Sequence, residues 1–192
     1  MLPVDLIADA FIQKSINPEN PEESDLLCPM RLQKLLYYSQ GWSLALRDRP
    51  LFDAEIEAWK HGPIISSIYR RFQHLGSQGI LPESEAKGIN GSRTMVLIVD
   101  MIWQHYGKFS ASRLRAMTLA ELPWRTARTG VPADAVTAVP ISHDSMKSFF
   151  RQESIRRAGT ILDPRVVWQI EEKAESESTI SSEELFGELI PS

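Results

Sequence analysis

The segment Leu51–Phe72 constrains the fold of this chain most, because it joins a strand-like stretch, a Gly-Pro pair and an amphipathic stretch. Residues 55–59 (EIEAW) have the character of a short strand, and Gly62-Pro63 follows closely. Proline suits the first position of a helix because its fixed φ matches the helical value. We therefore expect a small β element within residues 51–59, a tight turn at Gly62-Pro63, and a helix over about residues 63–74.

Hydrophobic periodicity predicts helices over most of the remaining chain. The segments with apolar residues at helical spacing are about residues 4–14, 29–47 and 92–105, a short helix around Leu114 and Met117 after Ser110 or Ser112, a helix with Pro123 in its first turn that ends at Gly130, and 143–151. Residues 92–105 are apolar almost all round, so we expect this helix at the centre of the core. The fold class is therefore mainly α, a compact multi-helix bundle with a small β element near residues 51–59 and a C-terminal helical extension.

Individual polar and small residues add detail to this fold. In the 29–47 helix, Arg31 and Lys34 are expected towards the side away from the apolar stripe. Gly41 lies inside the same helix, where glycine costs about 1 kcal/mol relative to alanine, and we expect it to mark a close contact between helices. Thr118 and Glu121 have the spacing of a capping box at a helix start.

Length and composition predict one ordinary domain with an appendage. The chain has 192 residues, of which 43% are hydrophobic and 24% charged, so a core can form. We place a helical domain at residues 1–152 and a helical, acidic extension at residues 153–192, where Asp163-Pro164 has the form of a helix start. The longest apolar run, residues 95–99, is too short to span a membrane. The N-terminus does not resemble a signal peptide, and we expect a cytoplasmic protein.

Charge is distributed unevenly along the chain. Residues 171–192 hold seven acidic residues and one basic residue, whereas the rest of the chain is close to neutral. The strongest basic patch combines Arg113, Arg115, Arg125 and Arg128 with Glu121, a net charge of +3 (four minus one). Nucleic-acid binding would require more clustered Lys and Arg with exposed aromatic residues between them. A face that binds protein, or one that is only solvated, is the better interpretation of this patch.

Aromatic residues near the Gly62-Pro63 turn allow two interpretations. Trp, Tyr and Arg are the residues most enriched at interface hot spots, which favours partner binding by Trp59, Tyr69 and Trp124, together with His61. The alternative is that these side chains only pack around the turn and hold the fold. Both interpretations stay open at the level of the sequence.

Catalytic and metal-binding patterns are weak. The four histidines and the single cysteine, Cys28, do not have the short spacings that zinc sites use, and we predict no metal and no cofactor. Cys28 precedes a predicted helix, but a packed, inert cysteine is favoured over a nucleophile. Asp100 interrupts an apolar helix, and we expect a structural role, either hydrogen bonds to a nearby loop or a salt link to Arg113 or Arg115, with a functional buried acid as the alternative. We predict that the protein is not an enzyme.

Three blocks in order, residues 30–46 (MRLQKLLYYSQGWSLAL), 51–72 (LFDAEIEAWKHGPIISSIYRRF) and 117–128 (MTLAELPWRTAR), resemble the Panacea domain family. This family includes SocA-like and GepA-like proteins, found in toxin–antitoxin pairs and in phage-derived genes. The resemblance extends more loosely over about residues 3–152. One position departs from the pattern: the third block usually reads Met-Thr-His, and Leu119 stands in place of the His here.

The resemblance implies an antitoxin that neutralises a cognate protein toxin by direct binding, with a variant in which it is a proteolytic adaptor that delivers the toxin to a ClpXP-type protease. Our alternatives are a DNA-binding regulator of its own operon and a phage-derived interaction protein. We also expect the extension from Asp163 onward to contribute to partner binding. The candidate partner-binding residues are Trp59, Lys60, His61, Tyr69, Arg113, Arg115, Trp124, Arg125 and Trp168.

Overall fold

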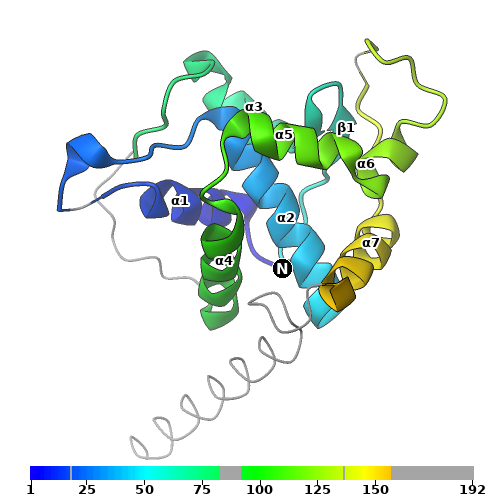
Figure 1. Cartoon of the computed structure of the whole chain (residues 1–192), viewed down its shortest axis with the longest axis horizontal. Coiled ribbons are helices and arrows are strands. Elements are labelled where there is room, and N and C mark those ends of the chain that lie inside the picture. Colours follow the sequence, from blue (N-terminus) through cyan, green and yellow to red (C-terminus); the bar gives the residue numbers. More distant parts are fainter. Residues whose placement is uncertain (18, 83–91, 136, 157–192) are drawn as a thin grey trace, which may run out of the picture.

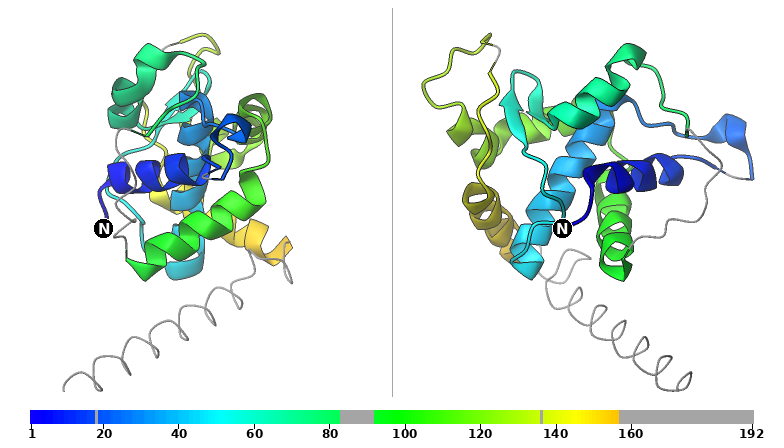
Figure 2. Two further views of the ribbon diagram at one scale, coloured as in Figure 1. Left: turned by 90° about the vertical axis from the view of Figure 1, so that its left-hand side faces the viewer. Right: turned by 180° about the vertical axis from the view of Figure 1, so that it is seen from behind.

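The computed structural model describes residues 1–17, 19–82, 92–135 and 137–156 (Figures 1 and 2). Within these ranges the fold is mainly α with a small two-stranded sheet, as the sequence predicts. The elements are α1 (Val4–Lys14), η1 (Pro21–Glu23), α2 (Pro29–Arg47), β1 (Glu57–Trp59), β2 (Gly62–Ile64), α3 (Ser66–Phe72), η2 (Gln73–Leu75), α4 (Arg93–Tyr106), α5 (Ala111–Ala120), α6 (Leu122–Ala127) and α7 (His143–Arg156). None of the helices in these ranges is long and apolar enough to cross a membrane.

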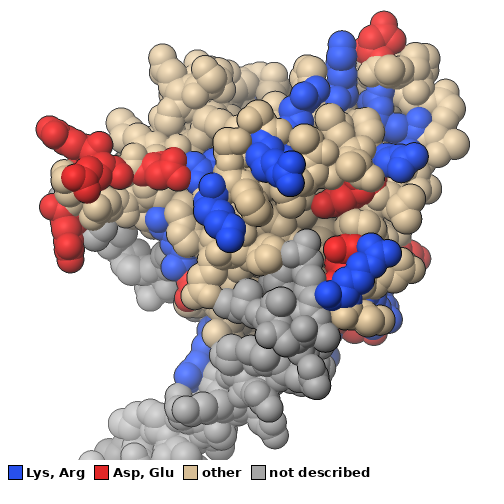
Figure 3. All heavy atoms as spheres, viewed as in Figure 1, with Lys and Arg blue, Asp and Glu red and all other residues tan. Residues whose placement is uncertain are grey.

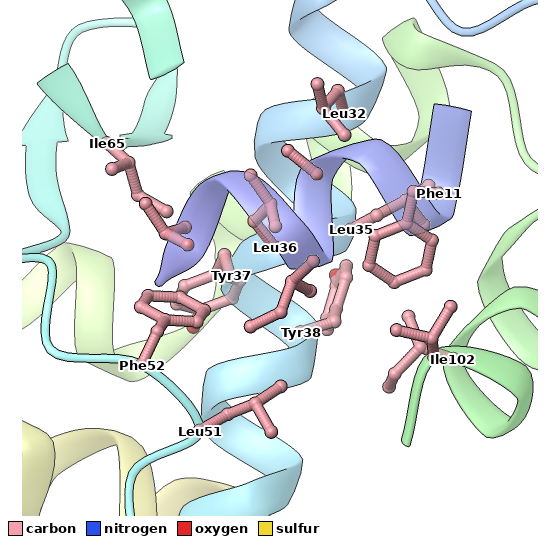
Figure 4. Packing of buried hydrophobic residues seen from close by; sticks show 14 of the residues in the cluster. Phe11, Leu32, Leu35, Leu36, Tyr37, Tyr38, Leu51, Phe52, Ile65 and Ile102 are labelled. Carbon is pink, nitrogen blue, oxygen red and sulfur yellow. The ribbon is translucent and has the colours of Figure 1, made fainter. Parts of the chain in front are cut away.

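Helix α2 lies at the centre of the molecule. It packs against α1, α3, α4, α5, α7 and β2, and it runs through the middle of the ribbon in Figure 1. Figure 4 shows its apolar side chains among Phe11 of α1, Ile102 of α4 and Phe52 of the segment before the hairpin. The expectation that residues 92–105 form the centre was wrong. Helix α4 buries only one face, and Val96 on its other face is 37% exposed.

The polar residues of α2 are buried as well, contrary to the expected exposed side. Arg31 donates to both carboxylate oxygens of Asp25, at 2.8 and 2.6 Å, and to the backbone carbonyl of Gly107. Lys34 is completely buried. A buried polar group is tolerated when its hydrogen bonds are satisfied, and the polar side chains of α2 find these partners in neighbouring backbone. The amphipathic pattern therefore did not distinguish a solvated face from a face that binds backbone.

The Gly62-Pro63 pair lies within a hairpin and does not begin a helix, which corrects the sequence prediction. β1 and β2 pair antiparallel with Trp59 opposite Gly62, so Lys60 and His61 form the turn. Helix α3 begins later, at Ser66. Proline is compatible with β2 because this position of the strand donates no hydrogen bond to β1, and proline has no N–H to donate. The other edge of β1 contacts residues 139–141, where Ala58 N–H donates to the Val139 carbonyl and Ile141 N–H to the Ile56 carbonyl.

Other helix boundaries largely agree with the sequence. Helices α1 and α2 have the predicted bounds, and Ser92 and Ser110 cap α4 and α5 by accepting backbone N–H groups. Helix α7 begins at His143 as expected but continues to Arg156, past the proposed domain boundary at residue 152. The predicted helix start at Asp163-Pro164 lies outside the described residues.

Gly41 brings α2 and α7 into close contact, as predicted. A Cβ atom at Gly41 would overlap the ring of Phe150. That ring makes edge-on contacts with Tyr37, Tyr38 and Trp42, with ring centroids between 5.4 and 6.0 Å apart. The glycine therefore makes room for an aromatic cluster that joins the two helices.

We predict that Gly41→Ala lowers the free energy of unfolding by about 1–3 kcal/mol, the usual cost of an overpacked core. The intrinsic gain of alanine over glycine in a helix is only about 1 kcal/mol, so the overlap with Phe150 should dominate. Urea denaturation of both proteins measures the difference.

The control is the same substitution in a Phe150→Leu background. There the overlap is relieved, and Gly41→Ala should be neutral or stabilising relative to Phe150→Leu alone. Equal destabilisation in both backgrounds would show that Phe150 is not the cause.

Candidate functional site

Helix α2 holds the chain between residues 49 and 65 by hydrogen bonds from its side chains to backbone. The Gln33 amide accepts from Ile65 N–H at 2.7 Å and donates to the Ile65 carbonyl at 3.2 Å. Gln40 repeats this arrangement about two turns further along the helix, accepting from Leu51 N–H at 2.8 Å and donating to the Phe52 carbonyl at 2.9 Å. The two amides supply the backbone hydrogen bonds that a sheet would otherwise provide. They fix to α2 the chain on both sides of the hairpin.

Lys34 binds the hairpin beside its turn. Its Nζ donates to the Pro63 carbonyl at 2.9 Å. Gly62 has a φ of +99°, and a Cβ there would lie 2.8 Å from Lys34 Nζ and 2.9 Å from Thr118 Oγ1. Glycine is therefore required both by the left-handed backbone and by the close approach of α2 and α5. Burial, and secondly the charge of Arg115, lower the pKa of Lys34 to about 7.

Helix α6 is attached to the other strand of the hairpin. Trp124 Nε1 donates to the Trp59 carbonyl at 2.9 Å, and Arg128 Nη1 donates to the Ala58 carbonyl at 3.0 Å. The Arg128 guanidinium also lies over the Trp124 ring, 5.6 Å from its centroid. Arg128 is only 7% exposed, so it is a structural residue. Its assignment to the exposed basic patch was wrong.

Glu121 marks the corner between α5 and α6, and the predicted capping box does not form there. The Glu121 backbone is extended and its side chain makes no cap hydrogen bond at the start of α6. Its Oε1 instead accepts from Tyr38 Oη at 2.9 Å, while Thr118 Oγ1 donates to the Arg115 carbonyl at 3.0 Å. The corner is thus held against α2 by a buried tyrosine, whose pKa is raised well above its usual value by burial and then by the Glu121 charge.

Several predicted partner-binding residues meet around the hairpin turn. Lys60 and His61 are exposed in the turn, and Arg115 Nη2 lies 3.2 Å from His61 Nδ1. The Trp59 and Tyr69 rings are 5.0 Å apart. We call this region the hairpin surface; its residues are Trp59, Lys60, His61, Tyr69, Arg115 and Trp124, together with Arg125, the exposed residue that follows Trp124 on α6. Burial, followed by the charges of Arg115, Lys60 and Lys34, lowers the pKa of His61, so this surface gains little from histidine charge at neutral pH.

The two tryptophans have the structural role that the packing interpretation expects, and the binding interpretation stays a prediction. Both are half-buried. Trp124 bonds to the Trp59 backbone, and Trp59 Nε1 donates to Glu57 Oε2 at 2.6 Å. Their ring N–H groups therefore serve the fold. Part of each side chain remains accessible, and tryptophan commonly has one polar bond and one exposed apolar surface at interfaces.

Three candidates lie elsewhere. Arg113 is exposed on α5, but two residues at about 100° each separate it from Arg115 around the helix, so it projects away from the hairpin. Trp168 lies outside the described residues. We expected that a salt link from Asp100 would go to an arginine of α5. In the structure, Asp100 Oδ1 instead pairs with Lys14 Nζ of α1 at 2.5 Å. In the described part of the chain, no group of three His, Cys, Asp or Glu side chains is arranged to hold a metal ion.

Sequence reasoning missed the supporting role of the buried residues that bind the backbone in and beside the hairpin, namely Gln33, Lys34, Gln40 and Arg128. The signal was present in α2, where long polar side chains recur on every side of an otherwise apolar helix. A helix that is central and also polar must direct those groups to backbone.

We predict that stability rises with pH from about 7 to 9 because of Lys34. In this window the unfolded chain keeps the proton, with an ordinary pKa of 10.5, whereas the folded chain loses it at about 7. One proton contributes at most about 1.4 kcal/mol per pH unit to the free energy of unfolding. Lys34→Met should remove this slope, and Lys108→Met, at an exposed site, should keep it; chemical denaturation at several pH values measures both. An unchanged slope in Lys34→Met would contradict the assignment.

Comparison with known proteins agrees with the resemblance predicted from the three sequence blocks. Residues 32–125 match the family model described as "Antitoxin SocA-like, Panacea domain". This segment contains most of α2, the hairpin, α5 and the first part of α6. Antitoxin SocA of Caulobacter vibrioides (strain NA1000 / CB15N) is 28% identical over 137 residues, which cover 66% of this chain and 73% of that protein. No solved structure matches the chain. The resemblance to the antitoxin SocA-like Panacea domain family is therefore confirmed over residues 32–125.

Proposed function

We propose that this protein is a cytoplasmic antitoxin that neutralises a cognate protein toxin by direct contact. The observation that carries the proposal is the match of residues 32–125 to an antitoxin family, together with the similarity to antitoxin SocA. The matched segment comprises the elements that build and support the hairpin surface. A role in binding also fits a non-catalytic regulator, which is what an antitoxin relative suggests.

We propose that the hairpin surface is the contact face for the toxin. Its turn is held by α2 through Lys34 and by α6 through Trp124, so little conformational entropy remains to be lost on binding. It presents aromatic rings and arginine, the side chains that dominate interface hot spots. Support for this assignment comes from geometry and residue type.

Growth rescue tests the antitoxin role. The gene adjacent to this one is induced with and without this chain, and the two products are purified together. We expect the neighbour to be toxic alone, harmless with this chain and retained on it during size-exclusion chromatography. A harmless neighbour that does not co-elute would overturn the proposal.

Rescue in a strain that lacks ClpP separates two mechanisms. If the antitoxin blocks the toxin by occupying it, rescue persists without the protease. If it is a proteolytic adaptor for a ClpXP-type protease, rescue fails while the two proteins still co-elute. We propose delivery as the finer form of the function, since the SocA-like resemblance implies an adaptor variant.

Charge reversal tests the contact face. We predict that Lys60→Glu with Arg125→Glu weakens toxin binding by about tenfold or more, the effect of about 1.4 kcal/mol, because both cations are exposed in the hairpin surface. The unfolding temperature should stay close to that of the parent chain. Binding is measured by surface plasmon resonance at two salt concentrations.

The matched control is Arg49→Glu, an exposed cation beyond the far end of α2. About 20 Å of helix separates that end from Lys34, at 1.5 Å per residue. The control should bind like the parent. Equal weakening by both changes would indicate a general charge effect and would contradict a specific contact face.

A further inference from the structure

The hairpin surface carries positive charge that the described part of the chain does not neutralise. Among the described residues, no carboxylate forms a salt bridge with Lys60, Arg115 or Arg125. Two acidic side chains of the same elements serve the fold: Glu57 accepts from Trp59 Nε1 and from Ser66 Oγ, and Glu121 accepts from Tyr38. In the view of Figure 3, Lys and Arg gather over α5, α6 and the hairpin, and Asp and Glu gather over the segment around η1.

Apolar side chains accompany these cations. Tyr69 is 37% exposed and Leu122 is 54% exposed. Leu122 lies three residues before Arg125 on α6, so both project from the same side of the helix. A suitable ligand would therefore combine several carboxylates with a few apolar residues.

Residues 171–192 of this chain have that composition. They contain seven acidic residues and one basic residue, and their acids surround the apolar run Leu185-Phe186 and the pair Leu189-Ile190. The segment begins 15 residues after Arg156, the end of α7. Fourteen intervening residues can span up to about 50 Å at 3.3–3.6 Å each. The last turns of α7 lie at the far end of α2, where Arg151 Nη2 is 3.6 Å from Asp48 Oδ2. About 20 Å of helix separates that end from Lys34, so the hairpin surface is within the span of the intervening residues.

We propose that the hairpin surface is the docking site for residues 171–192 of the same chain. The carboxylates face Lys60, Arg115 and Arg125, and the apolar residues contact Tyr69 and Leu122. Because the segment is covalently attached, its effective concentration is in the millimolar range, which lets weak, charge-dominated contacts form. The proposal does not depend on the antitoxin function, since both partners belong to this chain.

The docking has a consequence for any acidic partner of this surface. Such a partner must displace the segment, so its apparent affinity is reduced by the fraction of molecules in which the surface is free. Removing charge from the segment should then tighten partner binding. If the extension instead contributes to partner binding, as we expected from the sequence, the same change should weaken partner binding.

Paramagnetic relaxation measured by NMR on the full chain tests the docking directly. Cys28 is the only cysteine, so a Cys28→Ser, Ser178→Cys chain can carry one nitroxide label within the acidic segment. We expect the amide signals of Lys60, His61 and Arg125 to broaden at about 50 mM salt and to recover at about 500 mM, where charges are screened beyond a few ångströms. Lys60→Glu with Arg125→Glu should abolish the broadening, and Arg49→Glu should preserve it.

Two outcomes would overturn the proposal. The first is the absence of broadening at the hairpin surface at low salt, or broadening that persists unchanged after the double charge reversal. The second is broadening that occurs between chains, seen when labelled chains are mixed with unlabelled, isotope-enriched ones; this result would assign the segment to a second copy. Failure here leaves the rescue experiment unaffected, so the two proposals are tested separately.

Discussion

The hydrogen bonds from buried side chains of α2 to the backbone of residues 49–65 are the interactions on which the rest of the structure depends. Each of Gln33, Lys34 and Gln40 is almost fully buried, and a buried polar group left unsatisfied costs about 1–3 kcal/mol. The segment that satisfies them contains only β1 and β2 as regular structure, and α6 and residues 139–141 hold it from another side. The position of the hairpin, and hence of the exposed turn, follows from the satisfaction of these groups.

The sequence predicted the boundaries of α1 and α2 well, because proline and apolar spacing define both helices locally. It failed at Pro63, since a proline suits the first turn of a helix and also a strand position that needs no N–H donor; only the pairing with Ala58 distinguishes them. It also placed Lys34 and Arg128 in solvent, because charge usually implies exposure. Both residues donate instead to backbone carbonyls that are distant in the sequence, and no local pattern contains that information.

The sequence indicated only part of the candidate site, again because contacts between distant residues decide the rest. Residue type pointed to Trp59, His61 and Tyr69, and the fold brings them together with Arg115 and Trp124. Arg113 is close to Arg115 in the sequence but projects to another side of α5. The supporting residues were missed because their role is to hold backbone, which depends on tertiary contacts. Family resemblance supplied the antitoxin hypothesis, and the structure adds a preorganised surface on which that hypothesis can be tested.

The hairpin has no free edge on which a partner could add a strand. On β1, residues 139–141 already occupy the outer backbone groups, and on β2, Pro63 lacks an N–H while its carbonyl accepts from Lys34. Recognition by β-augmentation, which relies on main-chain hydrogen bonds common to all sequences, is therefore blocked at these positions. Any partner bound at this surface would therefore be distinguished by side chains in the turn and on the adjoining helices. Such a surface can change its exposed side chains by point substitution during evolution while the backbone beneath them stays fixed.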